Sequence, residues 1–186
     1  MLDLGRTFLQ SVERSPSAPA IVDGDLLLTY EQWLARIRCV AAGLHELGLR
    51  HGDRLLAILQ NRWEAATLHW ACQFAGVVIV PLNWRAKPDE LDYCVRDAGA
   101  RALVFEPVSA DAVLESPAAQ EIPCIALDHA PGGSLSFDTL LDVTPRPDST
   151  LAAADDISLM LYTSGTTGRP KGVPRRHRQE RAAALA

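Results

Sequence analysis

The chain has 186 residues, of which 48% are hydrophobic and 22% are charged, and its formal net charge is −5. This length and composition are typical of one globular domain, or part of one, and they exclude a collagen-like, disordered or strongly basic chain. The charge is uneven, because residues 169–181 carry six Arg or Lys against one Glu, or +5. This basic tail either assists an anionic ligand or forms a solvated helix face, and no nucleic-acid partner is expected.

Cysteine use and hydropathy indicate the compartment. The four cysteines form no Cys-x-x-Cys pair and no ligand-like spacing with histidine: Cys39, Cys72, Cys94 and Cys124. We therefore expect buried thiols in a reducing environment and no zinc site. No signal-peptide segment and no apolar stretch of membrane-spanning length is found. The sequence thus predicts a cytoplasmic protein with no transmembrane segment.

The first part of the chain predicts a short helix, a β-hairpin and a long helix. Apolar residues recur at helical spacing over 4–12, and short strands at 20–23 and 26–30 flank a Gly-Asp turn. Thr29 then stands at an N-cap position with Gln32 three residues later, which is the spacing of a capping box. The buried stripe of this helix is expected to comprise Trp33, Ile37, Val40, Ala41, Leu44 and Leu47, with Gly48 ending it.

From residue 54 onward, strands and helices alternate. Strands are predicted at 54–59, 77–81, 102–105 and 123–127, with helices at 61–75, from Pro88 onward and at 110–114, the first of them opened by Asn61. The segment 77–81 is almost entirely apolar, as in a strand buried on both faces of a parallel sheet. The sequence therefore predicts an α/β fold with a mostly parallel sheet flanked by helices. Residues 129–156 are expected to form a surface connection with a helical turn at 137–141.

Residues 161–173 combine hydroxyl groups, glycines and a lysine more densely than any other part of the chain, reading Leu-Tyr-Thr-Ser-Gly-Thr-Thr-Gly-Arg-Pro-Lys-Gly-Val. Gly165, Gly168 and Gly172 lack a Cβ, so the backbone N–H groups can approach an anion closely. Hydroxyl groups and an ammonium group add donors: Thr163, Ser164, Thr166, Thr167 and Lys171. The segment therefore predicts a polyphosphate-binding turn between two β-strands.

Two other interpretations of this segment are weaker. It is not a Walker A loop, because Lys171 follows Pro170 and precedes Gly172, whereas that motif requires Gly-Lys-Ser/Thr. A flexible Ser/Thr/Gly linker is the commonest use of such a composition. A linker needs neither the lysine nor the apolar strand predicted at 157–162, so phosphate binding is favoured.

This segment resembles the phosphate-binding signature of the adenylate-forming (AMP-binding) superfamily, which contains acyl-CoA synthetases, aromatic acid–CoA ligases, luciferases and peptide-synthetase adenylation domains. Two less specific elements support the resemblance, Leu-Thr-Tyr at 28–30 and the Gly…Pro-Leu-Asn-Trp-Arg element at 76–85. Both are also explained structurally, as a helix cap and as a buried strand followed by a turn. The residues Pro-Leu-Asn-Trp-Arg at 81–85 and Val-Pro-Arg-Arg-His at 173–177 are most similar to those of acyl-CoA synthetases acting on fatty or aromatic acids. A peptide-synthetase adenylation domain or a non-catalytic nucleotide-binding remnant are the alternatives.

The resemblance implies an ATP-dependent, AMP-forming acid–thiol ligase. Such an enzyme activates a carboxylic acid as an acyl-adenylate and transfers the acyl group to CoA, using ATP and Mg²⁺. The residues implied to bind the ATP phosphates are Thr163, Ser164, Gly165, Thr166, Thr167, Gly168 and Lys171, and neither a catalytic residue nor a metal ligand is implied within the chain. Residues 1–186 are expected to be the N-terminal portion of the AMP-binding domain, truncated after the phosphate loop, without the C-terminal domain and inactive alone.

Two further residues have open roles. Arg85 follows a predicted strand and is expected to form a salt bridge within the scaffold more readily than to contact a ligand. His177 lies where the superfamily has a histidine after Ser or Thr, although Arg176 occupies that preceding position here. A role beside the nucleotide and acyl pocket and a structural role within a helix are both compatible with the sequence.

Overall fold

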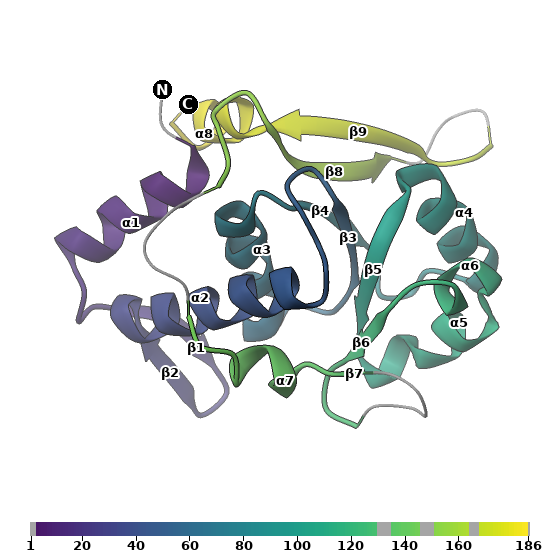
Figure 1. Ribbon diagram of the computed structural model, residues 1–186, viewed down its shortest axis with the longest axis horizontal. Helices are drawn as coiled ribbons and strands as arrows, with labels where there is room; N and C mark the ends of the chain where they lie inside the picture. The colour runs from purple at the N-terminus through teal and green to yellow at the C-terminus, as the bar shows by residue number, and fades with distance from the viewer. Residues whose placement is uncertain (1–2, 130–134, 146–150, 164–167, 186) are drawn as a thin grey trace.

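The computed structural model describes residues 3–129, 135–145, 151–163 and 168–185. Within these residues a seven-stranded sheet runs through the middle of the molecule in the order β7-β6-β5-β3-β4-β8-β9 (Figure 1). Its strands are β3 (Arg54–Ile58), β4 (Val78–Leu82), β5 (Ala100–Phe105), β6 (Cys124–Ala126), β7 (Leu135–Ser136), β8 (Ile157–Thr163) and β9 (Lys171–Arg176). Neighbours pair in parallel, except that β9 is antiparallel to β8. The predicted mostly parallel sheet is confirmed.

Helices cover both faces of this sheet. One face carries α1 (Leu4–Arg14), α2 (Tyr30–Glu46), α3 (Trp63–Ala75), α7 (Asp138–Leu141) and the hairpin of β1 (Pro19–Asp23) and β2 (Leu26–Thr29). The other carries α4 (Pro88–Ala98), α5 (Ala110–Glu115) and α6 (Pro117–Gln120), with the 3₁₀ turn Pro107–Ser109 before α5. The last helix, α8 (His177–Leu185), follows β9 and lies beside α1 (Figure 1). The chain is thus an α/β sandwich with a separate core on each side of the sheet.

The cap of α2 is the one that the sequence predicts. The Thr29 hydroxyl oxygen accepts from the Gln32 backbone N–H at 3.3 Å, and the Gln32 side-chain oxygen accepts from the Thr29 N–H at 3.0 Å. The cap of α3 is different, because Asn61 does not open this helix and Arg62 is its N-cap, without a side-chain cap bond. Instead, the Asp23 carboxylate of the β1–β2 hairpin accepts from the Trp63 N–H at 2.9 Å. A residue forty positions away thus satisfies a donor of the first turn, which local sequence cannot reveal.

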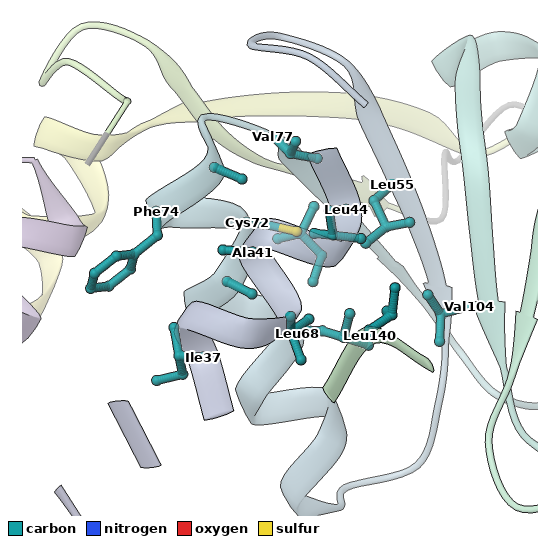
Figure 2. Close-up of a cluster of buried hydrophobic side chains, with 14 of the residues drawn as sticks. Ile37, Ala41, Leu44, Leu55, Leu68, Cys72, Phe74, Val77, Val104 and Leu140 are labelled. Carbon is teal, nitrogen blue, oxygen red and sulfur yellow. The ribbon is translucent and has the colours of Figure 1, made fainter. Parts of the chain in front are cut away.

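The larger core lies between α2, α3 and the sheet. Figure 2 shows Leu44 of α2, Leu68 and Cys72 of α3 and Leu55 of β3 meeting there, and all four are 0% exposed. The predicted stripe of α2 is largely confirmed: five of its six residues are buried and Leu47 is partly buried. Residues 129–156 are not only a surface connection, because Phe137 and Leu140 are 3% and 2% exposed and pack against this core. Their apolar side chains therefore make α7 part of the domain.

Gly43 makes room for α7, and Gly43→Ala is expected to destabilise the fold. A Cβ at Gly43 would lie 2.8 Å from Leu140 Cδ2 and 3.0 Å from Leu140 Cα. Overpacking of this kind costs about 1–3 kcal/mol, partly offset by the better helix propensity of alanine. Urea unfolding should therefore show a lower midpoint at an unchanged slope. In a Leu140→Ala background the same substitution should cost less, and an equal cost in both backgrounds would contradict the clash.

Among the described residues, every helix is too short or too polar to cross a membrane.

Candidate phosphate-binding hairpin

The predicted phosphate segment lies at the tip of the β8–β9 hairpin. The strand expected at 157–162 is β8, and the extended chain expected after Pro170 is β9, so the segment joins two β-strands as predicted. In the described ladder β8 runs parallel to β4, with Leu159 opposite Ile79. Thr163 therefore ends β8 at the carboxyl edge of the parallel strands, where α/β sheets bind ligands.

Three of the seven predicted phosphate-binding residues fall within the described part of the chain, namely Thr163, Gly168 and Lys171. Thr163 and Lys171 are paired across the hairpin and both are exposed. Paired residues of antiparallel strands present their side chains on the same face, so a hydroxyl and an ammonium group are brought together there. Gly168 has φ +122°, a conformation that favours glycine. The other four, Ser164, Gly165, Thr166 and Thr167, lie outside the described residues.

Gly172 has a different role from the one expected. It does not adopt a positive φ, and a Cβ on it would lie 1.9 Å from Met160 Cε and 3.3 Å from Tyr162 Cζ. Both neighbours are on β8, and Tyr162 is the cross-strand partner of Gly172. The missing side chain therefore lets these two side chains pack over β9 and is explained without an anion.

The positive charge of the tail is divided between internal contacts and the hairpin tip. Arg175 pairs with Glu180, Arg178 pairs with Asp155 at 3.0 Å and Arg176 donates to the Asp155 carbonyl. Among the described residues, no carboxylate lies within ion-pair distance of Lys171. Three of the six cations of the tail are therefore bound to their own neighbours. At the tip, the Arg169 guanidinium lies over the ring of Tyr93, and Lys171 is exposed without a carboxylate partner among the described residues.

His177 has a structural role. Its side chain is 1% exposed, and its Nδ1 accepts a hydrogen bond from the Leu4 N–H at 3.2 Å. Its own backbone N–H donates to the Asp156 carbonyl at 3.1 Å. The imidazole therefore joins the first turn of α1 to the start of α8. This contact requires an unprotonated Nδ1, and burial correspondingly lowers the pKa of His177.

We expect the fold to become less stable on acidification from pH 7.5 to 5.5. Burial lowers the pKa of both His69 and His177 below the ordinary value of 6.5. The unfolded chain then binds more protons than the folded chain as the pH falls through 6.5, so protonation favours unfolding. Urea unfolding across this range should show the loss, and His177→Asn, whose side chain also contains an acceptor, should reduce it. Carboxylates with lowered pKa values, such as Asp128, affect stability only as they become protonated, at about pH 4 and below, which is outside this range. A stability independent of pH between 5.5 and 7.5 would contradict this interpretation.

Arg85 does not form the expected salt bridge with any described residue. Its guanidinium lies over the ring of its neighbour Trp84, 3.9 Å from the centroid. The side chain is exposed, and the Arg85 N–H donates to the Asn83 side-chain oxygen at 2.9 Å. A planar cation stacks readily on an indole, which explains why the adjacent tryptophan replaces a carboxylate.

An ion-pair network surrounds Arg62, and no feature of it was predicted from the sequence. The guanidinium lies 2.8 Å from Glu64 Oε2, 2.9 Å from Asp128 Oδ2 and 3.3 Å from Glu106 Oε2. Hydrogen bonds with Glu64 and then Asp128 raise the pKa of Arg62, which stays charged. The Gln60 N–H also donates to Glu106. A detectable feature was present in the sequence, because Glu106 directly follows β5, and Gln60 and Asp128 each come two residues after the ends of β3 and β6.

This network occupies the place where the strand order reverses. The connection after β3 passes through α3 on one face, whereas the connection after β5 passes through α5 on the other. Neighbouring strands with such divergent connections commonly border a ligand site. Here Arg62 and its carboxylates pair with one another at that edge, whereas Thr163 and Lys171 at the end of β8 form no ion pair with any described residue. No group of three or more His, Cys, Asp or Glu within the described ranges is arranged to hold a metal ion.

Comparison with known proteins identifies the same family that the sequence of the hairpin resembles. The model of the family described as AMP-binding enzyme matches residues 8–186. A feruloyl-CoA synthase from Amycolatopsis sp is 36% identical over 174 residues, covering 94% of this chain and 33% of that protein. The long-chain-fatty-acid–CoA ligase FadD13 of Mycobacterium tuberculosis is 30% identical over 186 residues, covering 99% and 37%. The chain thus spans about a third of the length of these relatives.

Solved structures share the fold. A benzoate CoA ligase from Burkholderia xenovorans LB400 matches with a TM-score of 0.86 at 22% identity, over 100% of this chain and 36% of that one. The anthranilate CoA ligase AuaEII, solved in complex with anthranoyl-AMP, matches with a TM-score of 0.88 at 24% identity, over 99% and 36%. The fold, the hairpin sequence and the family match agree, and the chain belongs to the AMP-binding enzyme family.

Proposed function

We propose that this chain supplies the polyphosphate-binding hairpin of an ATP-dependent, AMP-forming acid–thiol ligase. The observation that carries the proposal is the pairing of Thr163 with Lys171 at the carboxyl end of β8, next to Gly168 at φ +122°, in a member of this family. The residues that we propose to contact the phosphates are Thr163, Ser164, Gly165, Thr166, Thr167, Gly168 and Lys171. Residues 1–186 then form the N-terminal portion of the AMP-binding domain.

The role of these residues is electrostatic. In the proposed reaction a substrate carboxylate attacks the α-phosphate of ATP, forming the acyl-adenylate and releasing pyrophosphate. Negative charge grows on the leaving β- and γ-phosphates, and fixed N–H, hydroxyl and ammonium donors stabilise it. None of these groups has to remove a proton. Mg²⁺ would enter with ATP, and we assign no protein ligand to it among the described residues.

The substrates are inferred from the relatives. Their printed names include feruloyl-CoA synthase, long-chain-fatty-acid–CoA ligase and, at 32% identity, the fatty acid–[acyl-carrier-protein] ligase ScoC of Streptomyces coeruleorubidus. These support an aromatic or fatty carboxylic acid, ATP and a thiol acceptor such as CoA, in fatty acid or aromatic acid metabolism. The four cysteines are free, which fits a reducing cytoplasm.

Two assays on the 186-residue chain test this proposal. Calorimetric titration with ATP and Mg²⁺ should show saturable binding, because the hairpin lies within the chain. Exchange of labelled pyrophosphate into ATP, with ferulate or a long-chain fatty acid present, should stay at background, because the chain spans only about a third of its relatives. Absence of ATP binding at millimolar concentration would refute the phosphate assignment. Robust exchange would refute the expectation that the chain alone is inactive.

A further inference from the structure

The distal half of the β8–β9 hairpin extends beyond its main-chain pairing with the sheet. The described ladder between β4 and β8 pairs Ile79 with Leu159, four residues before β8 ends at Thr163. Beyond Leu159, the described partner of β8 is β9, and most of β9 is exposed. A two-stranded ribbon of this kind is marginally ordered by itself. Other contacts must therefore fix where the hairpin tip lies.

Helix α4 makes those contacts from the side. The Tyr162 hydroxyl of β8 donates to Asp97 Oδ2 at 2.6 Å, and the Tyr93 hydroxyl donates to Asp97 Oδ1 at 3.3 Å. The two phenol rings meet edge to face, with centroids 6.5 Å apart and planes at 78°. On the other side of the tip, the Arg169 guanidinium lies 5.2 Å from the centroid of Tyr93. Both chain segments that flank residues 164–167 thus reach Tyr93 of α4, and Tyr162 also reaches Asp97.

We propose that Tyr93 and Asp97 of α4, with Tyr162 and Arg169 of the hairpin, form a clamp that positions the phosphate-binding tip. This proposal rests on the proposed function and adds positioning residues to it. The four residues are called the α4 clamp below. None of them has to touch a phosphate, because Tyr162 is directed to α4 while Thr163, its neighbour, lies on the opposite face of β8 with Lys171.

The clamp has a rigid base. Tyr93 and Asp97 are four residues apart, so they lie on one face of α4. The opposite face of this helix is buried in the second core through Leu91, Cys94 and Val95, which are 0%, 0% and 4% exposed. One carboxylate also joins two phenols through its two separate oxygens, which fixes its orientation. Burial and then the hydrogen bond to Asp97 raise the pKa of Tyr162, so its hydroxyl stays protonated and donates at neutral pH.

The clamp is expected to strengthen phosphate binding because it orders the hydrogen-bond donors of the tip before the phosphate binds. A hydrogen-bond donor that must first be ordered contributes less to binding than one already held in place. Loss of the clamp should therefore weaken phosphate binding while leaving the two cores intact. It should also change the environment of the hairpin before any ligand is added.

Titration of the ¹⁵N-labelled 186-residue chain with inorganic pyrophosphate, followed by ¹H–¹⁵N NMR, tests the clamp. The variants are Tyr162→Phe, which keeps the ring, and Asp97→Asn. The matched control is Asp92→Asn on the same helix, because Asp92 accepts from the Ala118 N–H at 2.7 Å and pairs with Arg96, and none of its described hydrogen bonds is to the hairpin. Tyr162→Phe and Asp97→Asn should each weaken pyrophosphate binding about fivefold. The double variant should be little worse than either, because Tyr162→Phe removes the Tyr162–Asp97 hydrogen bond and Asp97→Asn weakens the same bond by removing the carboxylate charge.

Two readouts separate the clamp from a merely structural role. In the clamp variants without ligand, the Gly168 and Gly172 amide resonances should shift while those of the cores do not. In Asp92→Asn these two resonances should stay in place and pyrophosphate affinity should change less than twofold. If wild type binds and both clamp variants bind within twofold of it, the clamp is overturned. If wild type does not bind, the proposed function fails, and unshifted Gly168 and Gly172 resonances in the clamp variants would overturn the clamp as well.

Discussion

Arg62→Ala should lower the free energy of unfolding by about 3 kcal/mol, the largest loss of stability that we expect from a charged residue in this chain. The Arg62 side chain is 21% exposed, and the carboxylate side chains of Glu64 and Glu106 are 9% and 5% exposed. Removing the guanidinium leaves these two carboxylates nearly buried without a cation, which costs about 3–5 kcal/mol for a fully buried pair. Asp128, at φ +60°, also loses the partner that holds it.

Arg178→Ala is the matched control for this prediction. It also deletes an arginine from an ion pair, but Arg178 and Asp155 are 51% and 72% exposed, and exposed pairs contribute about 0–1 kcal/mol. Urea unfolding at neutral pH measures both variants. A second variant, Glu106→Gln, should partly restore stability to Arg62→Ala, because it removes one of the unpaired charges. Equal losses for Arg62→Ala and Arg178→Ala would show that the network does not act as a buried unit.

Lys171→Ala should weaken ATP and pyrophosphate binding by about tenfold or more. The ammonium lies opposite Thr163 at the hairpin tip, exposed, and is not paired with a carboxylate among the described residues. One charge-assisted contact to a phosphate contributes about 1.4 kcal/mol or more, which corresponds to a factor of ten. Added salt should reduce the difference between the two proteins, because screening weakens the charge in wild type.

Arg178→Ala controls for net charge in this second experiment as well. It removes the same unit of positive charge from the basic tail, but its side chain is bound to Asp155. Calorimetric titration should give a wild-type-like affinity for this variant, within about twofold. If both variants lost affinity equally, the tail would act by its overall field, and Lys171 would have no specific contact with phosphate.

The sequence predicted the elements whose determinants are local. The capping box of Thr29 and Gln32, the proline that begins α4 and the apolar run of β4 each depend on residues within a few positions. The family resemblance likewise depended on one continuous segment, residues 161–173. Local sequence was therefore sufficient for this part of the fold, and the phosphate-binding role of residues 161–173 stays a prediction.

Features that depend on distant residues were not predictable in the same way. The cap of α3 comes from Asp23, and the burial of Leu140 depends on Gly43 of another helix. Arg62 meets Glu106 and Asp128 only because β3, β5 and β6 end at one edge of the sheet. The strand order that causes this meeting is a property of the whole fold, so no short motif reports it.

The most direct measurement of the central claim is a residue-resolved pyrophosphate titration of the 186-residue chain by ¹H–¹⁵N NMR. The claim is that the hairpin tip binds polyphosphate, so shifts that saturate should concentrate at Thr163, Gly168 and Lys171. Resonances around Arg62, at the neighbouring sheet edge, should change little because that edge is filled by ion pairs. Saturable shifts centred on Arg62 with an unchanged hairpin would contradict the account, as would no shifts at all at millimolar pyrophosphate.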